Sequence, residues 1–235
     1  MTSLTDRLIL ITGASRGLGA ALAEACAAEG ARLILLARTR GALEEVDDRV
    51  RSLGAEATLL PLDLADLDAV DRLGPSIYQR FGRLDGLAAC AAELGTLTPT
   101  PQLDPKTLQR VLTVNLLANQ RLIRTLDPLL RASGAGRAVF LTDRTASQGR
   151  PFWGAYGASK AALESVALAW SAETARITRL RVNLADPGPM RTRLRAQAFP
   201  GENPSSLPAA GERAMSLLSL LLPTSERAGE LVSLA

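Results

Sequence analysis

The chain has 235 residues, a net charge of +3 and 47% hydrophobic residues, which is typical of one globular domain. It contains no histidine, and this excludes histidine-based catalytic triads, zinc sites built on imidazole and a histidine general base. The small charge does not favour nucleic-acid binding, and the longest apolar run, at 217–222, is far below the ~20 residues that span a bilayer.

Apolar runs rich in β-branched residues alternate with helical patterns along the whole chain, which predicts one α/β domain, 1–235, with a parallel sheet. The predicted strands are 7–12, 32–37, 57–61, 85–91, 136–142, 180–185 and 230–234. The predicted helices are 17–29, 41–53, 66–81, 104–132, 153–177 and 206–222. The segment 189–208 has four prolines and no strong period, so we expect a long loop that acts as a lid or binding element.

A glycine-rich turn, ITGASRGLG, joins the first predicted strand to the first predicted helix. Gly13, Gly17 and Gly19 permit a tight turn and a close backbone approach, so that a pyrophosphate can lie on the helix N-terminus. In this βαβ context the turn predicts a dinucleotide site, although a plain strand–helix turn is the alternative.

The end of the second predicted strand indicates which dinucleotide binds. An acidic residue there would hold a ribose 2′-hydroxyl, whereas this chain has Arg38, with Arg16 inside the glycine turn. Two guanidinium groups near one phosphate favour NADP(H) over NAD(H). The alternative is that both arginines are solvated surface residues.

The sequence AYGASK places Tyr156 and Lys160 four residues apart on a predicted helix, hence on one face. A nearby ammonium group favours the phenolate, so we expect Lys160 to lower the pKa of Tyr156 from its usual ~10. Such a tyrosine can donate a proton to a carbonyl oxygen or accept one from an alcohol. Lys106 and Lys160 are the only lysines in a chain otherwise rich in arginine, so position 160 either needs a compact ammonium or carries lysine by chance.

Together the glycine turn and the Tyr–Lys pair resemble the short-chain dehydrogenase/reductase family over essentially the whole chain. The resemblance implies a single Rossmann domain with a doubly wound, seven-stranded parallel sheet flanked by helices on both faces. It implies hydride transfer between NAD(P)H and a carbonyl or alcohol, with catalytic residues Tyr156, Lys160, Asn115 and position 143. It also implies a homodimer or homotetramer built on helices 104–132 and 153–177. The residues predicted to bind the cofactor are Gly13, Ser15, Arg16, Gly17, Leu18, Gly19, Arg38, Asp63, Leu64, Ala91, Lys160, Pro187, Gly188 and Thr192.

One member of this set departs from the family. The resemblance places a substrate-binding serine thirteen residues before the tyrosine, where this chain has Asp143. A carboxylate cannot donate to a developing oxyanion and would repel it. Three alternatives would still allow catalysis. Thr142, Thr145 or Ser147 supplies the hydroxyl, Asp143 is protonated and donates, or the substrate presents a donor or cation to Asp143.

A second departure lies at 89–92, where Ala-Cys-Ala-Ala replaces Asn-Asn-Ala-Gly. Cys90 is either a reactive thiol beside the cofactor or, more simply, a small buried residue, and Cys26 is predicted to lie in the core. The two cysteines offer no disulfide framework or metal-ligand spacing, so no metal is predicted. Arginines at 191, 193 and 195 either bind a phosphorylated or carboxylated substrate or form a solvated loop face.

Two hypotheses follow. The first is an NADP(H)-preferring oxidoreductase that acts on a small carbonyl or alcohol substrate, with Asn115 anchoring a water relay. The second is a dinucleotide-binding sensor or scaffold with little or no turnover, which Asp143 and the 89–92 segment favour. In either case we expect a cytoplasmic protein, since the N-terminal residues lack a signal-peptide layout, and no nucleic-acid or membrane partner.

Overall fold

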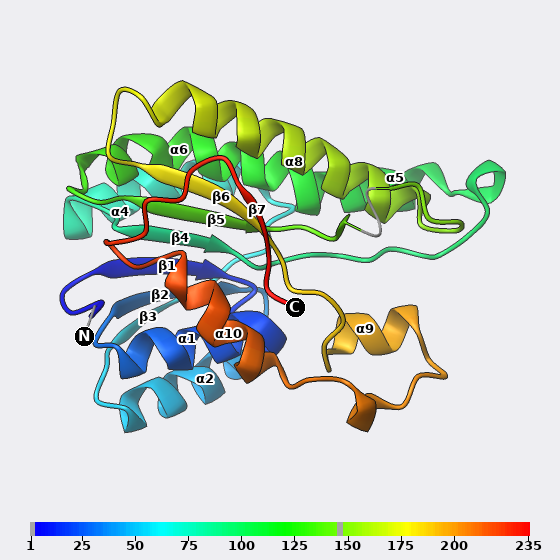
Figure 1. The fold of residues 1–235 in the computed structure, drawn as a ribbon, viewed down its shortest axis with the longest axis horizontal. Helices are drawn as coiled ribbons and strands as arrows, with labels where there is room; N and C mark the ends of the chain where they lie inside the picture. The colour runs from blue at the N-terminus through cyan, green and yellow to red at the C-terminus, as the bar shows by residue number, and fades with distance from the viewer. Residues whose placement is uncertain (1–2, 145–147) are drawn as a thin grey trace.

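A computed structural model describes residues 3–144 and 148–235. Its centre is a seven-stranded, wholly parallel sheet with the strand order β3-β2-β1-β4-β5-β6-β7 (Figure 1). This architecture confirms the doubly wound Rossmann prediction, because the order reverses between β1 and β4. The strands are β1 (Leu8–Thr12), β2 (Arg32–Ala37), β3 (Ala57–Pro61), β4 (Gly86–Ala89), β5 (Arg137–Leu141), β6 (Arg181–Asp186) and β7 (Leu231–Ser233).

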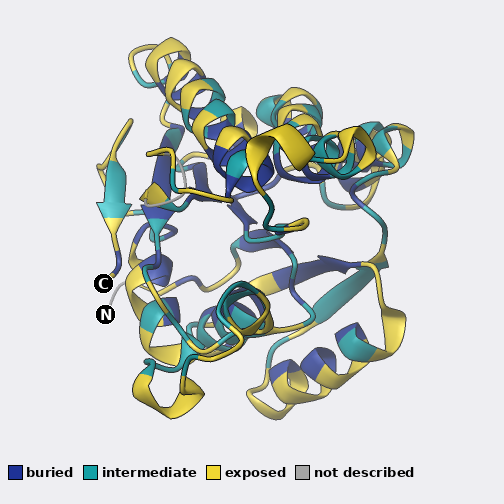
Figure 2. Ribbon diagram, turned by 90° about the vertical axis from the view of Figure 1, so that its right-hand side faces the viewer, coloured by how far each residue is buried: buried dark blue, intermediate teal, exposed yellow. Residues whose placement is uncertain are grey.

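Helices cover both faces of the sheet, and alternate strand residues pack against each layer. The helices on one face are α1 (Gly17–Ala28), α2 (Arg40–Ser52) and α10 (Ala210–Ser219), and those on the other are α3 (Leu67–Asp71), α4 (Leu73–Phe81), α6 (Ala118–Ala132) and α8 (Gly154–Thr174). Ile9 and Leu33 belong to the first core, whereas Leu10 and Ile34 belong to the second. Buried residues accordingly follow the strands and the inward sides of the helices in Figure 2.

The helix predicted at 66–81 is two helices, α3 and α4. Pro75 explains the break, because a proline cannot donate to the carbonyl of Asp71 four residues earlier and its ring crowds that carbonyl. The oxygen of Asp71 accepts instead from the hydroxyl of Thr125, at 2.9 Å. The same hydroxyl accepts from the backbone of Gly74 at 3.1 Å, so α6 replaces the hydrogen bond that α3 and α4 lack.

The helix predicted at 104–132 is also interrupted. Asp104 caps α5 (Pro105–Leu112) by accepting from Thr107 at 2.9 Å, and α6 completes the segment. Between them, Thr113–Leu117 forms a π-helical turn that contains Asn115. Such a turn inserts one extra residue into the helical repeat, and it frequently lies at a functional site.

The predicted loop at 189–208 contains a short helix, α9 (Arg193–Ala198), and a 3-10 turn at Pro204–Ser206. The side chain of Thr192 caps α9 by accepting from Arg195 at 3.2 Å, which explains why the helix begins there. Helix α9 lies apart from the helical layers, beyond the carboxyl ends of the strands (Figure 1). In the part of the chain that the structure describes, no helix is long and apolar enough to cross a membrane.

Candidate functional site

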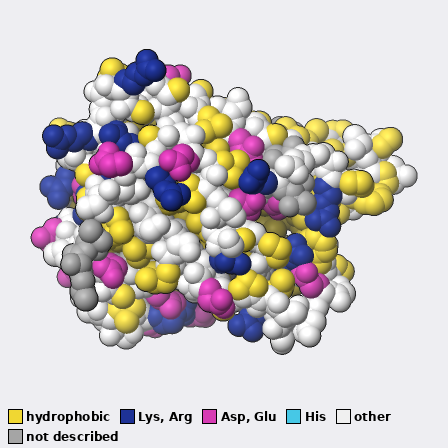
Figure 3. Space-filling view, in the orientation of Figure 1, with side chains coloured by type: hydrophobic (Ala, Val, Ile, Leu, Met, Phe, Trp, Pro, Cys, Tyr) yellow, Lys and Arg dark blue, Asp and Glu magenta, His cyan; other side chains and the backbone are white. Residues whose placement is uncertain are grey.

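A large cleft, about 1470 Å³ in volume, lies at the carboxyl ends of the strands. Figure 2 looks onto this edge of the sheet. Every residue predicted to bind the cofactor lines this cleft, as do Tyr156 and Asp143. Asn115 does not line it, but lies directly behind it in the π-helical turn. Basic and acidic side chains are interspersed over the face shown in Figure 3.

The glycine turn lies at the switch point between β1 and β4. Gly13 has φ +65°, and a Cβ atom on it would lie 2.8 Å from the Cα of Ala91, which follows β4. The hydroxyl of Thr12 accepts from the backbone of Ala91 at 3.2 Å and ties the two strand ends together. Gly17 has φ +55°, and the space for its Cβ is bounded by Thr192. Glycine is therefore required at position 13 both for its backbone conformation and for the close approach.

Substitution of Gly13 by alanine is expected to lower the free energy of unfolding by about 2–5 kcal/mol, because positive φ and overpacking add together. The matched control is Gly54→Ala, since Gly54 also has φ +81° but has no atom within 4 Å of its Cβ position. The control substitution is expected to lower the free energy of unfolding by only about 1–2 kcal/mol. Urea unfolding of both variants measures the difference, and equal losses would contradict the close approach to Ala91.

Asp63 and the two arginines predicted to bind the 2′-phosphate lie along one wall of the cleft. Arg16 and Arg38 are exposed, and neither forms a salt bridge with any residue in the described ranges. Asp63 accepts from the backbone of Ala65 at 2.9 Å and from Arg110 at 3.1 Å. Partial burial favours a raised pKa for Asp63, but these hydrogen bonds and the charges of Arg110 and Arg38 outweigh it and lower the pKa.

Arg110 was not identified from the sequence. It lies on α5 and joins Asp63 to Glu93, whose carboxylate it contacts at 3.1 Å. No local motif marks it, because its partners follow β3 and β4 and meet it only in the folded chain. Arg110 therefore fixes the carboxylate of Asp63, which was predicted to bind the cofactor.

Tyr156 and Lys160 lie on one face of α8, as predicted, and both are almost completely buried. The ammonium of Lys160 is 5.4 Å from the centroid of the Tyr156 ring and donates to the carbonyl of Leu141 at 2.8 Å. Burial lowers the pKa of Lys160 to about 8, although Asp143, Cys90 and Glu164 act in the opposite direction.

The expected lowering of the Tyr156 pKa is wrong for the chain on its own. Burial raises the pKa of Tyr156, and the negative charges of Asp143 and Asp186 raise it further. The phenol is 5% exposed, so the phenolate loses most of its hydration, and this loss is the largest cause of the raised pKa. The neutral phenol is consequently the favoured form, which suits a proton donor.

Asn115 braces the backbone rather than facing the open cleft. Its side-chain oxygen accepts from the backbone of Glu93 at 2.8 Å. Its nitrogen donates to the Glu93 carbonyl and to the Ser159 hydroxyl, each at 2.9 Å. The main-chain carbonyl of Asn115 accepts from Asn119 at 2.8 Å. These contacts tie the π-helical turn to the segment after β4 and to α8.

Comparison with known proteins decides the family. The sequence pattern of short chain dehydrogenases matches residues 7–203. The chain belongs to the short-chain dehydrogenase/reductase family. It is 39% identical over 207 residues to the uncharacterized oxidoreductase YciK of Escherichia coli, covering 87% of this chain and 81% of that protein.

Solved structures of the family agree with the fold. A short chain dehydrogenase from Shigella flexneri superposes with a TM-score of 0.93 at 35% identity and covers 98% of this chain and 91% of that one. An Escherichia coli chain of this family, solved in complex with NADPH, gives a TM-score of 0.92 at 36% identity over 99% of this chain and 98% of that one. The chain is therefore an oxidoreductase of the short-chain dehydrogenase/reductase type.

Position 143, where the sequence resemblance predicts a serine, is occupied by Asp143. Asp143 lines the cleft and acts electrostatically on both Tyr156 and Lys160. Of the hydroxyls considered as replacements, Thr142 donates to the carboxylate of Glu164 on α8 and is thereby occupied. Thr145 and Ser147 lie outside the described residues. The structure therefore does not support Thr142 as the hydroxyl that replaces the predicted serine.

The two cysteines differ in position, but burial raises the pKa of both thiols. Cys26 lies on α1 and is completely buried in the core, as predicted. Cys90 lines the cleft, where burial raises the pKa of the thiol to about 12 despite the nearby charge of Lys160. A thiol with this pKa carries little thiolate at neutral pH, which favours the simpler interpretation of Cys90 as a small buried residue.

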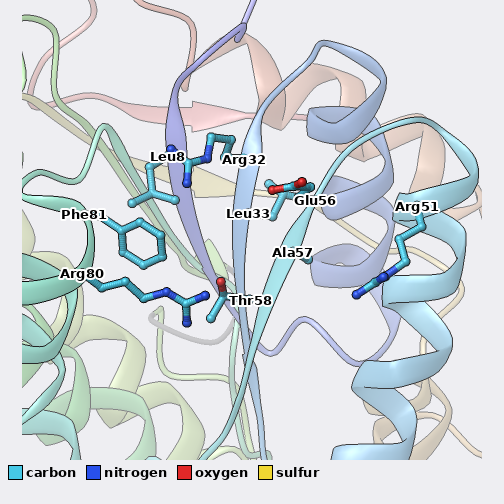
Figure 4. A pocket seen from close by; sticks show the side chains of 9 residues that line it. All are labelled: Leu8, Arg32, Leu33, Arg51, Glu56, Ala57, Thr58, Arg80 and Phe81. Carbon is cyan, nitrogen blue, oxygen red and sulfur yellow. The ribbon is translucent and has the colours of Figure 1, made fainter.

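A second, smaller pocket of about 230 Å³ lies at the opposite edge of the sheet, where β1, β2 and β3 begin (Figure 4). Arg32 and Arg80 lie on either side of the Phe81 ring, with guanidinium carbons 5.6 Å and 5.1 Å from its centroid. These arginines stack on the protein rather than converge on an open space. The pocket contains none of the predicted site residues.

Proposed function

We propose that the protein is an NADPH-preferring oxidoreductase that transfers hydride between the nicotinamide and a carbonyl or alcohol. The observation that carries the proposal is that one cleft is lined both by the glycine turn with Arg16 and Arg38 and by the Tyr156–Lys160 pair. Gly13, Ser15 and Gly17 line the cleft at the N-terminus of α1, where backbone N–H groups suit a pyrophosphate. The NADPH complex of an Escherichia coli relative supports the choice of cofactor.

In this proposal the bound cofactor supplies or accepts the hydride, and the residues of the chain bind, orient and move protons. Tyr156 holds a proton on its buried phenol and delivers it to the carbonyl oxygen of the substrate. Lys160, fixed by the carbonyl of Leu141, stabilises the phenolate that remains and holds the nicotinamide ribose. Asn115 acts by holding the π-helical turn against Glu93 and Ser159.

The preference for NADPH is proposed to rest on Arg38, with Arg16 beside it. The change Arg38→Ala is expected to weaken NADPH binding about tenfold and leave NADH binding unchanged, because only NADPH has the 2′-phosphate. The control is Arg40→Ala, since Arg40 is exposed, pairs with Glu44 at 2.9 Å and does not line the cleft. Titration of nicotinamide fluorescence measures both constants, and an equal loss for both nucleotides would contradict the role of Arg38.

A dinucleotide-binding protein with little turnover is the second candidate, and Asp143 favours it. The two candidates are separated by titrating the wild type with NADPH and then assaying a broad panel of carbonyl compounds. Tight binding together with turnover supports the oxidoreductase, whereas tight binding without turnover supports a sensor or scaffold.

We also propose a homodimer or homotetramer that forms through α6 and α8. Leu168 on α8 is exposed, and light scattering tests the assembly.

A further inference from the structure

An apolar wall stands beside Tyr156 in the cleft, separate from the two cores of the sheet. Leu94, Trp153 and Tyr156 form a buried cluster of their own, and Leu97, Leu194 and Phe199 pack against it. All of these residues line the cleft. They come from the segment after β4, the start of α8 and the α9 region, so the wall exists only in the folded chain.

The wall is built from ordered ring contacts. The Trp153 ring meets the Tyr156 ring edge-on, with centroids 5.7 Å apart and planes at 71°. Phe199 lies against the same indole with a centroid distance of 5.7 Å. Aromatic side chains in such contacts present a large apolar surface at a fixed place. Next to a proton-donating phenol, this surface suits the apolar body of a substrate.

Arg150 lies at the end of this wall. Its guanidinium carbon is 5.0 Å from the centroid of Trp153 and 4.8 Å from that of Phe199. Stacking uses the face of a guanidinium and leaves its N–H groups at the edge, where a carboxylate or phosphate binds. Arg150 is partly buried, lines the cleft and forms no salt bridge with the residues that the structure describes.

Two other arginines show why Arg150 is singled out. Arg195 also stacks on Phe199, at 3.7 Å, but its Nε and Nη2 each donate to the carboxylate of Glu202 at 2.6 Å. Arg193 lines the cleft but is exposed. Arg195 is therefore committed to Glu202, and Arg150 is the partly buried arginine on the aromatic wall that forms no salt bridge within the described residues.

The backbone holds Trp153 and Arg150 in this arrangement. Phe152 has φ +72°, a strained conformation for a bulky residue, and persists because its neighbours fix it. Its carbonyl accepts from Thr98 at 3.0 Å, and the carbonyl of Arg150 accepts from Trp153 at 3.2 Å. The turn exposes the Phe152 ring and buries the Trp153 ring.

We propose that the substrate carries an apolar segment ending in an anionic group, carboxylate or phosphate. The carbonyl would lie at Tyr156, the apolar segment along Trp153 and Phe199, and the anion at Arg150. This inference rests on the proposed function, because it describes a substrate of the same cleft. It makes Arg150 a residue that determines specificity rather than one that takes part in hydride or proton transfer.

Straight-chain oxo acids of increasing length, each paired with its neutral methyl ester, test the inference. The wild type is expected to prefer the best oxo acid over its ester at least about tenfold in kcat/KM, the effect of one charge-assisted pair. Arg150→Met keeps an unbranched apolar side chain against Trp153 and Phe199, so it should remove the preference for the oxo acid over its ester. Arg40→Met, outside the cleft, is the control. An unchanged preference in Arg150→Met, or a wild type that prefers esters, would overturn the proposal.

A binding measurement separates failure of this inference from failure of the proposed function. Calorimetry of octanoate, octyl phosphate and octanol with the NADPH-loaded protein requires no turnover. The two anions are expected to bind at least about tenfold more tightly than octanol to the wild type and equally weakly to Arg150→Met. If the anions bind more tightly than octanol but no ketone is reduced, the anion site at Arg150 is supported and the oxidoreductase proposal fails. Equal binding of all three probes overturns the anion site.

Discussion

Replacing Tyr156 with phenylalanine is expected to lower kcat for carbonyl reduction by about 10²–10⁴-fold, the usual range for loss of a general acid. NADPH affinity should not change. The substitution removes only the hydroxyl, so the ring keeps its contacts with Trp153 and with the ammonium of Lys160. Initial rates at saturating NADPH, followed by nicotinamide absorbance, measure the effect.

The chain offers a matched control for this substitution. Tyr78 is the other tyrosine of the sequence and is 66% exposed on α4, outside the cleft. Tyr78→Phe should retain full activity. A Tyr156→Phe variant that keeps more than about a tenth of the wild-type kcat would exclude Tyr156 as the principal proton donor.

Replacing Asp143 with serine is expected to raise kcat/KM for a neutral ketone by about 10²–10³-fold, the usual value of one hydrogen-bond donor to a developing oxyanion. The serine supplies a hydroxyl, and the change removes a negative charge that would repel the oxyanion. A serine variant slower than the wild type would show instead that Asp143 is adapted to a substrate of its own.

The same substitution has a signature in the pH dependence. Burial is the largest cause of the raised pKa of Tyr156, and the negative charge of Asp143, which disfavours the phenolate, is the second. Removing the charge lowers that pKa. Alcohol oxidation uses the phenolate as the base, so its rate should rise with pH and the rise should move to lower pH in the serine variant.

Asp143→Ala separates charge from hydrogen bonding in this test. It removes the carboxylate without adding a donor, so it should shift the pH profile of kcat/KM for alcohol oxidation in the same direction without the full gain in rate. Identical pH profiles for the wild type and both variants would show that Asp143 does not act on Tyr156.

Much of the fold was predictable because each strand is a short apolar run and each helix lies between two strands. The boundaries that were wrong depend on single local or tertiary features. Pro75 divides the helix predicted at 66–81, and the hydroxyl of Thr125 compensates from a distant helix. The π-helical turn at Asn115 adds one residue to an otherwise continuous helical pattern, which periodicity does not resolve.

The candidate site was predictable as a set of residues but not as an electrostatic environment. Spacing placed Tyr156 and Lys160 on one helix face, and the structure brings both into the cleft with the glycine turn. The pKa of Tyr156 was expected to fall, yet burial raises it, and burial is a property of the whole fold. Arg110 and Arg150 were missed because Asp63 reaches Arg110, and Phe199 reaches Arg150, only in the folded chain.

The central claim is that the cleft transfers hydride between NADPH and a carbonyl. Transfer of deuterium to a ketone from NADPH that is deuterated at the hydride position of the nicotinamide tests it most directly. Mass spectrometry of the product, with wild type and Tyr156→Phe side by side, reports hydride transfer and the role of Tyr156 together. Deuterated alcohol from the wild type, and little from the variant, is the expected result. Saturation of the cleft with NADPH without deuterated product from any carbonyl compound in the panel would contradict the assignment of an oxidoreductase active site.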